Sequence, residues 1–516
     1  MLGGLLGVLA VAASVRAYAW SQTEVMFNDG PIFLGMAQVV SEGRWAEVLA
    51  HPFHPLYPVL IALVEAATGL SWENSAVAVS LVGGLLSVLG VWLFVREAFD
   101  PGLALLAAWV VALHPWAVDF SSDVMSDGLY AGFYLLGFAA MASLIARPRL
   151  GAAIATGSMA GLAYLVRPEG IGLIVVAGLL LSVRAAHDRR ERRAILASGL
   201  VLLAASTALI GPLVVGVATQ TGEVGLTQKK SIVNLASGRE GGAARRGVGL
   251  NSIREETIPL PRSSESVDGP GASRPSRNLF GLGESIGRAV STSLAALRYE
   301  VAVFAVLGLW GLRGTWVGRR EATVLLPAAL YSGVLVLLVW GAGYVARRHA
   351  LAALLPFVAY ATLGWRGLQI SLIDRLKGLM SPSAGRWLKT SSGVCVVLVL
   401  ALLCVWGPRD LRARRGDRAA IRAAAEWLAT SAGEAEVIAA QKLRVAYYAR
   451  GHYVPLPSGR GIPMQTTLKR SGAGWVVIEE LNLEDHHGLA EGLGDWLQVV
   501  HVAGVDGRRA LVLELR

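Results

Sequence analysis

The sequence predicts a mainly α-helical, polytopic membrane protein that ends in a small α/β domain. Only 16% of the residues are charged, whereas soluble domains contain about 25%. Apolar runs long enough to span a bilayer, about 20 residues each, recur along the first four-fifths of the chain. From about Arg409 onward the apolar runs become short and alternate with polar segments. Together these observations predict about 11 transmembrane helices followed by an α/β region outside the membrane.

The first apolar run, residues 2–20, is interpreted as a retained transmembrane helix. Its small residues near the end resemble those of a signal peptide, but no Lys or Arg follows Met1 and the run is longer than a signal core. With this helix included, spans are expected near residues 2–20, 75–95, 102–118, 126–146, 151–166, 170–183, 195–218, 290–312, 322–341, 349–365 and 389–407.

The apolar run 55–69 is shorter than a span and begins with a proline. If it only dips into the membrane, most Lys and Arg of the short loops lie on one side. The positive-inside rule then places the N-terminus in the cytoplasm and the C-terminus outside, in a multi-pass protein of the cytoplasmic (plasma) membrane. The exceptions on the outer side are Arg44, Arg167, Arg347 and Arg348. A spanning 55–69 would break the rule repeatedly, so we expect a membrane-dipping helix there.

Two domains are expected, a membrane domain over residues 1–408 and an extracytoplasmic α/β domain over residues 409–516. The membrane domain includes the outer loop 21–54. It also includes a long outer loop over 219–289, rich in Gly, Ser, Pro and Arg, which we expect to be flexible beyond its start.

The outer domain carries short strand signals. Residues 418–433 have helical spacing, and residues 437–440 and 475–480 are expected strands. A Val-Asp-Gly turn near the C-terminus predicts a hairpin. The domain contains neither GxGxxG after a strand nor GxxxxGK[ST], so a soluble nucleotide site is not expected.

Composition also excludes some partners. The net charge of +10 does not indicate a nucleic-acid partner, because the basic residues mostly lie in short loops where membrane orientation explains them. Cys395 and Cys404 lie in one apolar segment and provide neither a disulfide framework nor a metal knuckle.

The predicted topology places unusual polar segments together on the outer side of the membrane. They are the loop 21–54, residues 114–128, the turn 167–170 and residues 344–350. Ionisable groups next to a bilayer are costly unless they have a function. Asp29 follows the first span and could take a proton from an attacking hydroxyl or amine. The alternative is a helix N-cap, because Asp-Gly-Pro precedes an amphipathic pattern.

Other outer residues have competing interpretations. His51 and His54 lack a third metal ligand at a defined spacing, so polar lining of a substrate groove is preferred. Asp119, Asp123 and Asp127 are spaced by four and would share one helix face, with Asp127 pointing into the outer cavity.

Two basic motifs are also predicted to lie on the outer side of the membrane. Arg167 and Glu169 form either a local ion pair in a turn or part of a cavity wall. Tyr344, Arg347, Arg348 and His349 cluster at the outer end of one span. Arginine suits phosphate because its guanidinium fork matches the phosphate oxygens; the alternative is contact with lipid headgroups of the membrane.

Together these segments resemble the GT-C superfamily of integral-membrane glycosyltransferases, in particular the bacterial lipid-A aminoarabinose transferases and protein O-mannosyltransferases. In that pattern an Arg late in the first helix precedes an acidic motif, as Arg16 precedes Asp29 here. Further motifs are matched by His54 to Pro58, by Pro115 to Asp127, by Arg167 to Glu169, and by Arg347, Arg348 and Pro356. Two positions depart from the pattern: relatives often have Asp-Glu where this chain has Asp29-Gly30, and His349 stands where Tyr is common.

The resemblance implies inverting transfer of a sugar from a polyprenyl-phosphate donor to a lipid, glycan or protein acceptor outside the cytoplasmic membrane. Asp29 would be the general base, and Asp127 would supply a second carboxylate. Arg347 or Arg348, helped by Lys229 or Lys230, would bind the donor phosphate. The remaining substrate-binding candidates are Arg16, His51, His54, Tyr57, Arg167 and Glu169. No cofactor or metal is expected, although distant relatives use a divalent cation and the Asp119, Asp123 and Asp127 trio leaves that open.

Two other classes of protein compete with this interpretation. A transporter or lipid flippase shares many spans and intramembrane charges, but no repeat relates the two halves of this chain and the charges gather at one face. A non-catalytic envelope scaffold would be consistent with the loss of a second acid after Asp29.

Overall fold

The structure is a computed structural model that describes residues 2–222, 224–226, 281–312, 319–343, 345–376, 379–433, 436–457 and 464–516. Lys229, Lys230, Tyr344 and most of the predicted loop 219–289 lie outside the described residues.

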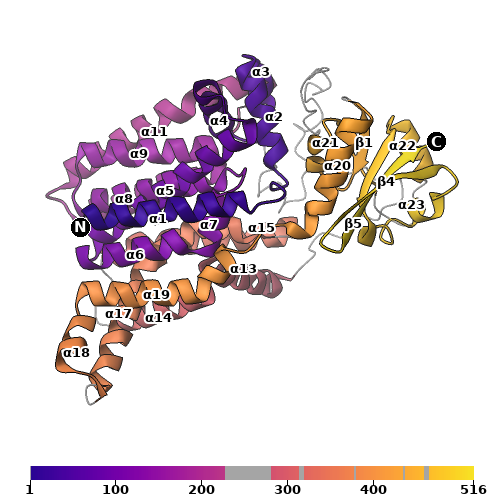
Figure 1. Cartoon of the computed structure of the whole chain (residues 1–516). Coiled ribbons are helices and arrows are strands. Elements are labelled where there is room, and N and C mark those ends of the chain that lie inside the picture. The colour runs from indigo at the N-terminus through magenta and orange to yellow at the C-terminus, as the bar shows by residue number, and fades with distance from the viewer. Residues whose placement is uncertain are drawn as a thin grey trace.

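The chain forms a helical bundle with an α/β domain at one end (Figure 1). The first half contains α1 (Leu2–Ser21), α2 (Gly30–Ser41), α3 (Trp45–Ala50), α4 (Leu56–Thr68), α5 (Trp72–Ala98), α6 (Pro101–Leu113), α7 (Pro115–Ser121), α8 (Asp127–Ala146), α9 (Leu150–Val166), η1 (Pro168–Gly170), α10 (Ile171–His187) and α11 (Arg192–Thr221). The second half of the bundle contains α13 (Leu282–Leu297), α14 (Tyr299–Gly311), α15 (Arg319–Ala342), α16 (Arg347–Leu354), η4 (Leu355–Phe357), α17 (Val358–Arg375), α18 (Pro382–Leu388) and α19 (Ser391–Asp410).

The number of spans agrees with the prediction of about 11. Within the described residues, eight helices or helix runs are long and apolar enough to cross a membrane, and the number is ten if each of two bent helix pairs counts as one span. The apolar helix α9, with 17 residues, is slightly shorter than these. The run 55–69 forms α4, an apolar helix of only 13 residues, which is too short to cross about 30 Å of hydrocarbon. The chain is therefore a multi-pass membrane protein.

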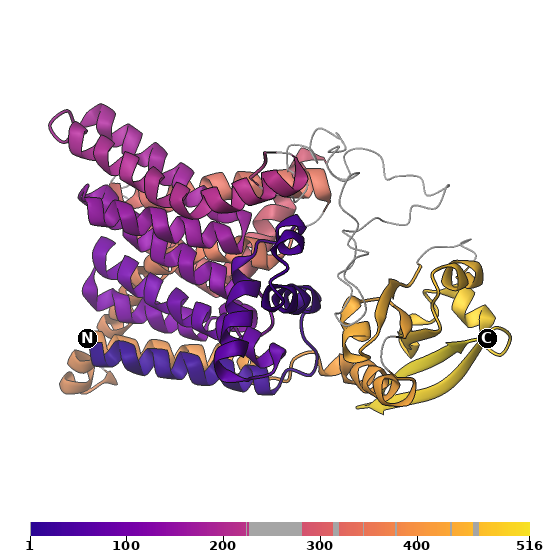
Figure 2. The ribbon, with the colours of Figure 1, turned by 90° about the horizontal axis from the view of Figure 1, so that it is seen from above.

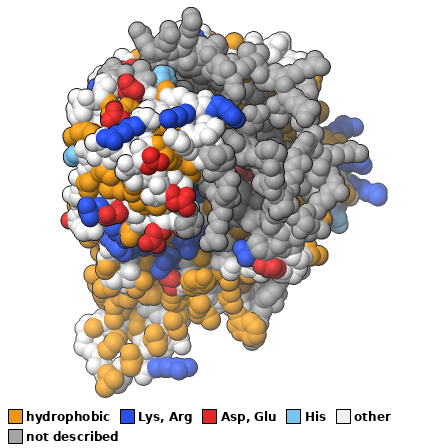
Figure 3. Space-filling model, turned by 90° about the vertical axis from the view of Figure 1, so that its right-hand side faces the viewer, with side chains coloured by type: hydrophobic (Ala, Val, Ile, Leu, Met, Phe, Trp, Pro, Cys, Tyr) orange, Lys and Arg blue, Asp and Glu red, His pale blue; other side chains and the backbone are white. Residues whose placement is uncertain are grey.

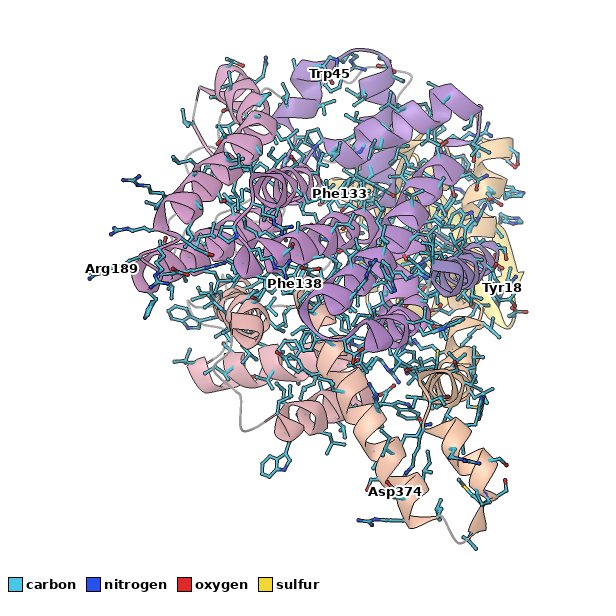
Figure 4. All side chains as sticks on the ribbon, turned by 90° about the vertical axis from the view of Figure 1, so that its left-hand side faces the viewer. Tyr18, Trp45, Phe133, Phe138, Arg189 and Asp374 are labelled. Carbon is cyan, nitrogen blue, oxygen red and sulfur yellow. The ribbon has the colours of Figure 1, made fainter. Side chains whose placement is uncertain are left out.

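Small residues bring the central helices into backbone contact. A Cβ atom added at Gly83 of α5 would lie 2.3 Å from the Cα of Leu129 in α8, and one at Gly90 would lie 2.7 Å from the carbonyl carbon of Leu135. Close backbone approach through glycine is a common way to pack helices in a membrane, where no hydrophobic force drives them together. Phe138 of α8 fills the bundle interior, whereas Arg189 projects from its edge (Figure 4).

One expected span is broken. Residues 290–312 were predicted as a single helix, but α13 and α14 meet at an angle of 94°. The break lies at Arg298, whose φ of +70° is incompatible with a continuing right-handed helix. The expected span 102–118 is also bent, by 60° between α6 and α7. The physical reason here is Pro115, which keeps His114 extended and cannot continue the helix.

The C-terminal region contains a five-stranded sheet of order β2-β1-β3-β5-β4. Its elements are α20 (Ala419–Ser431), β1 (Val437–Ala440), α21 (Leu443–Tyr448), β2 (His452–Pro455), α22 (Met464–Arg470), β3 (Trp475–Glu479), α23 (His487–Gly492), β4 (Leu497–Val505) and β5 (Arg508–Leu515). Strands β1, β2 and β3 are parallel, whereas β3, β5 and β4 are antiparallel. The predicted helix, the two strands and the hairpin are all present. Asp506 and Gly507 both have positive φ at the hairpin turn, as two-residue turns between strands require.

The α/β region lies beyond the end of the bundle that is opposite to the first residues of α1 (Figure 2). Acidic and basic side chains are interspersed on its face, while hydrophobic side chains dominate the helical part below it (Figure 3). Among the described candidate residues, Asp29, Asp127, Arg167 and Arg348 lie near one another around one pocket.

Candidate active site

Asp29 lies at the junction between the outer segment and α2. It occupies the N-cap position, but its side chain makes no capping hydrogen bond. Instead its Oδ2 accepts from Nη1 of Arg348 at 2.7 Å, and Arg348 is the second residue of α16. Both side chains are partly exposed, 26% and 21% respectively. The carboxylate is therefore paired with a cation at the surface rather than used to stabilise the helix.

Gly30 explains why the chain lacks a second acid next to Asp29. A Cβ atom at this position would lie 2.7 Å from the sulfur of Met26 and 3.3 Å from the Cβ of Val124. Both neighbours are buried, at 1% and 0% exposure. A glutamate here would require the surrounding core to open, so the pattern Asp-Glu cannot be accommodated without repacking.

We expect Gly30→Ala to destabilise the protein by about 1–3 kcal/mol, because added core volume forces neighbours out of place. Thermal unfolding of the purified protein in detergent measures this change. Gly172→Ala is the matched control: a Cβ there meets nothing within 4 Å, and helix propensity should make that change neutral or stabilising. An equal shift in both variants would contradict the packing argument.

Asp127 forms a buried ion pair with Arg167. Asp127 begins α8 and is 7% exposed, while Arg167 precedes η1 and is 8% exposed. Nη1 of Arg167 donates to Oδ1 of Asp127, and Nη2 lies 3.3 Å from Oε1 of Glu169. Burial lowers the pKa of Arg167, but the two carboxylates outweigh it and raise that pKa above its ordinary value. Arg167 thus remains a cation between two acids.

The predicted shared helix face of the three aspartates is wrong. Asp119 lies in α7, Asp123 follows the end of that helix, and Asp127 starts α8. Each acid has its own cationic partner: Arg409 and Arg414 for Asp119, Arg415 for Asp123, and Arg167 for Asp127. Within the described residues, no group of three or more His, Cys, Asp or Glu side chains could hold a metal ion.

A narrow pocket links the two ion pairs. It lies between α5, α7, α8 and α16, and both Asp127 and Arg348 line it. Its walls include small residues of α5, Gly84 and Ser87, and apolar residues such as Phe120. The structure therefore brings together Asp29, through Arg348, and the pair of Asp127 with Arg167.

Arg16 lies behind this pocket, buried in the bundle. Its Nη1 donates to the carbonyl of Ala112 at 2.9 Å and its Nε to Oγ of Ser121 at 2.7 Å. The Ala112 carbonyl precedes the bend at Pro115, where the helical hydrogen-bond pattern is interrupted. Arg16 thus stabilises the bend and supports Ser121, which lines the pocket, instead of facing it directly.

Arg347 stacks on an aromatic ring instead of forming part of the narrow pocket. Its guanidinium carbon lies 4.4 Å from the centre of a Trp116 ring, and that of Arg409 lies 3.9 Å from the same residue. Two cations therefore share the indole of Trp116.

His51 and His54 line a second pocket, together with Phe53, Tyr164 and residues of α11. Nδ1 of His54 lies 2.5 Å from the carbonyl oxygen of Tyr164. Tyr57 does not reach either pocket: it is fully buried, and its hydroxyl lies 3.1 Å from the Ala76 carbonyl and 2.8 Å from Ser80 Oγ. These hydrogen bonds of the Tyr57 hydroxyl hold α4 against α5.

Sequence reasoning missed the arginines that follow the last span. Arg414, Arg415, Arg422 and Arg444 reach back to the outer segments of the bundle. Arg444 is 3% exposed, and burial together with the nearby Arg418 and Arg415 lowers its pKa to about 10. The available signal was the arginine-rich run 409–418, RDLRARRGDR, which directly follows the last apolar span.

Comparison with known proteins agrees with this fold. Residues 50–210 match the profile of the family described as dolichyl-phosphate-mannose-protein mannosyltransferase. No curated protein matches the chain. ArnT from Cupriavidus metallidurans bound to undecaprenyl phosphate is similar in structure, with a TM-score of 0.58 and 13% identity over 99% of this chain and 98% of that chain. The apo oligosaccharyltransferase of Archaeoglobus fulgidus has a TM-score of 0.57 and 12% identity over 94% of this chain and 71% of that chain.

The chain therefore has the GT-C fold of integral-membrane glycosyltransferases. Residues 50–210, less than a third of the chain, carry the pattern of the mannosyltransferase family named above. The matched region contains Asp127 and Arg167 but neither Asp29 nor Arg348.

Proposed function

We propose that the protein transfers a sugar from a polyprenyl-phosphate donor to an extracytoplasmic acceptor, with inversion at the anomeric carbon and with Asp29 as general base. The acceptor class is a lipid, a glycan or a protein. The observation that carries the proposal is the pair of Asp29 with Arg348, at 2.7 Å, beside the pocket that Asp127 and Arg348 share. In this proposal the N-terminus is cytoplasmic, and the C-terminal domain lies outside the cytoplasmic membrane.

The pair is suited to an exchange of partners. A partly exposed ion pair contributes little stability, about 1 kcal/mol or less. A donor phosphate can therefore take over the guanidinium of Arg348, which matches its oxygens with two parallel hydrogen bonds. Asp29 loses its partner in the same step and becomes available as a proton acceptor.

The proposed reaction is a single displacement at the anomeric carbon of the donor sugar. The acceptor oxygen or nitrogen attacks the anomeric carbon, its proton passes to Asp29, and the bond from that carbon to the phosphate oxygen breaks with its electron pair. Arg348 stabilises the charge that develops on the departing phosphate, with Arg347 nearby on the same helix. Asp127, which lines the pocket and is paired with Arg167 behind it, accepts hydrogen bonds from the sugar hydroxyls.

The relatives support the donor class. ArnT from Cupriavidus metallidurans was crystallised with undecaprenyl phosphate, and the oligosaccharyltransferase of Archaeoglobus fulgidus with a tethered acceptor peptide. A lipid-linked donor also requires no soluble nucleotide site. The test is transfer from a panel of labelled polyprenyl-phosphate sugars, compared with nucleotide sugars, in membranes that contain the protein. Transfer from nucleotide sugars alone, or export of intact lipid without transfer, would refute the proposal.

Arg348→Gln should lower kcat for transfer by about 10²–10³-fold, the usual effect of removing one group that stabilises developing charge. Arg366→Gln is the control, because Arg366 makes a loose, exposed pair with Asp100 at 3.7 Å. Kinetics in detergent with saturating donor measure both. Equal losses in the two variants would show that Arg348 has no specific role.

A further inference from the structure

The outer segment 22–27, which leads from α1 to Asp29, is held by residues that follow the last span. The backbone of Arg414 pairs with it as a short parallel bridge: its amide donates to the Gln22 carbonyl at 3.0 Å, and its carbonyl accepts from the Glu24 amide at 3.2 Å. Nη1 of Arg422, in α20, donates to the Glu24 carbonyl at 2.6 Å. The C-terminal domain thus fixes the first half of the segment.

Helix α21 of the same domain holds both backbone polar groups of Met26. The Met26 amide donates to the Tyr448 hydroxyl at 2.9 Å, and its carbonyl accepts from Nη1 of Arg444 at 3.0 Å. Met26 lies three residues before Asp29, and its sulfur packs directly against Gly30. A displacement of Met26 would therefore displace the residue next to Asp29.

The next residue is fixed through an ion pair between the two parts of the chain. Arg415 pairs with Asp123, which is 2% exposed, and Oδ1 of Asp123 accepts from the Phe27 amide at 3.2 Å. The Phe27 ring in turn lies 4.9 Å from the guanidinium carbon of Arg348. Segment 22–27, which the C-terminal domain holds, therefore also contacts Arg348, the residue that pairs with Asp29.

Arg444 is unusual as a structural contact. It is 3% exposed, yet within the described part of the chain its guanidinium donates to a neutral backbone carbonyl and its Nε has no hydrogen-bond partner. Glu479 attracts this cation from a distance, but among the described residues no carboxylate forms an ion pair with it, and burial of such a cation is costly. A well-packed apolar side chain would join the two parts of the chain at lower cost, so the contact needs a reason other than stability.

We propose that the C-terminal domain is part of the catalytic machinery and that Arg444 is a positioning residue, which places Asp29 by fixing Met26. This inference rests on the proposed function and deepens it. Proton transfer requires the base within hydrogen-bond distance of the attacking group, and a misplacement of about 1 Å can cost 10²-fold in rate. Hydrogen bonds from Arg414, Arg422, Tyr448 and Arg444 to one short segment supply that placement.

The test compares Arg444→Met, Arg444→Lys and Tyr448→Phe in the full-length protein. Lys442→Met is the matched control, because Lys442 is an exposed cation two residues from Arg444. Hydrogen exchange of residues 22–29 is measured together with kcat and KM for a polyprenyl-phosphate sugar. We expect Arg444→Met to speed exchange in this segment and to lower kcat by about 10- to 100-fold with an unchanged donor KM. Arg444→Lys should restore part of kcat, Tyr448→Phe should show a smaller loss, and Lys442→Met should behave as wild type.

The outcomes separate the two proposals. Unchanged exchange in Arg444→Met, or faster exchange with unchanged kcat, overturns the positioning role while the transferase assignment stands. If Arg444→Met fails to fold, exchange will be faster throughout α20 and the sheet, and Tyr448→Phe then becomes the deciding variant. In Tyr448→Phe, faster exchange in residues 22–29 with an unchanged kcat overturns the positioning role. A wild-type protein that transfers no sugar refutes the proposed function instead, and the exchange of residues 22–29 still reports whether the domain holds them.

Discussion

Asp29→Asn is expected to abolish measurable sugar transfer, with a loss of about 10²–10⁴-fold, the usual contribution of a general base. The substitution retains the size of the side chain but removes its ability to accept a proton from the acceptor. Because Asp29 is only partly buried and its ion pair contributes about 1 kcal/mol or less, folding should be little affected. Transfer from a labelled polyprenyl-phosphate sugar, normalised to protein level in the membrane, measures the loss.

Glu24→Gln is the matched control, since Glu24 is an exposed acid in the same outer segment. It should transfer sugar at the rate of the wild type. If Asp29→Asn retained full activity, Asp29 would not be the base, and Asp127, which lines the neighbouring pocket, would become the candidate.

Arg167→Leu is expected to destabilise the protein by about 3–5 kcal/mol, because it leaves the carboxylate of Asp127 buried without its cation. The two side chains are 10% and 7% exposed, so water cannot replace the lost partner. Thermal unfolding of the purified protein in detergent measures the effect. The double variant Arg167→Leu/Asp127→Leu should recover most of the loss, because a neutral apolar pair has no unpaired charge.

Arg366→Leu is the control for this experiment. Its partner Asp100 is 51% exposed, and such surface pairs contribute about 1 kcal/mol or less. A loss in Arg167→Leu no larger than that of Arg366→Leu would show that the pair of Arg167 with Asp127 is not a structural charge pair of the site.

Hydropathy predicted most of the fold because a membrane helix must be apolar along its whole length. It could not predict the break at Arg298. The residues on both sides of this position are apolar, and although Arg298 and Glu300 interrupt them, an average hydropathy over 290–312 does not show a change in the direction of the chain. The bend between α6 and α7 does have a local signal, because the proline at 115 disfavours a helical conformation at His114.

The candidate site was predicted residue by residue, but not as pairs. Asp29 and Arg348 were each selected because a charge beside a bilayer needs a reason. Their contact joins positions 319 residues apart, and no local pattern encodes such a pairing. The three aspartates were assigned to one helix face because their spacing fits a helix. Because α7 ends at Ser121, the three aspartates do not lie on one helix, and each forms an ion pair with a different arginine.

The sequence by itself determined the class of protein, the number of spans, the α/β elements of the last hundred or so residues, and the charged residues gathered at one end of the bundle. These depend on composition and on local periodicity, which each segment carries alone. Only the tertiary structure decided that Asp29 pairs with Arg348, that Gly30 has no room for a second acid, and that Arg444 holds Met26. Those facts depend on distances between segments remote in the chain, which are fixed when the helices and the C-terminal domain pack together.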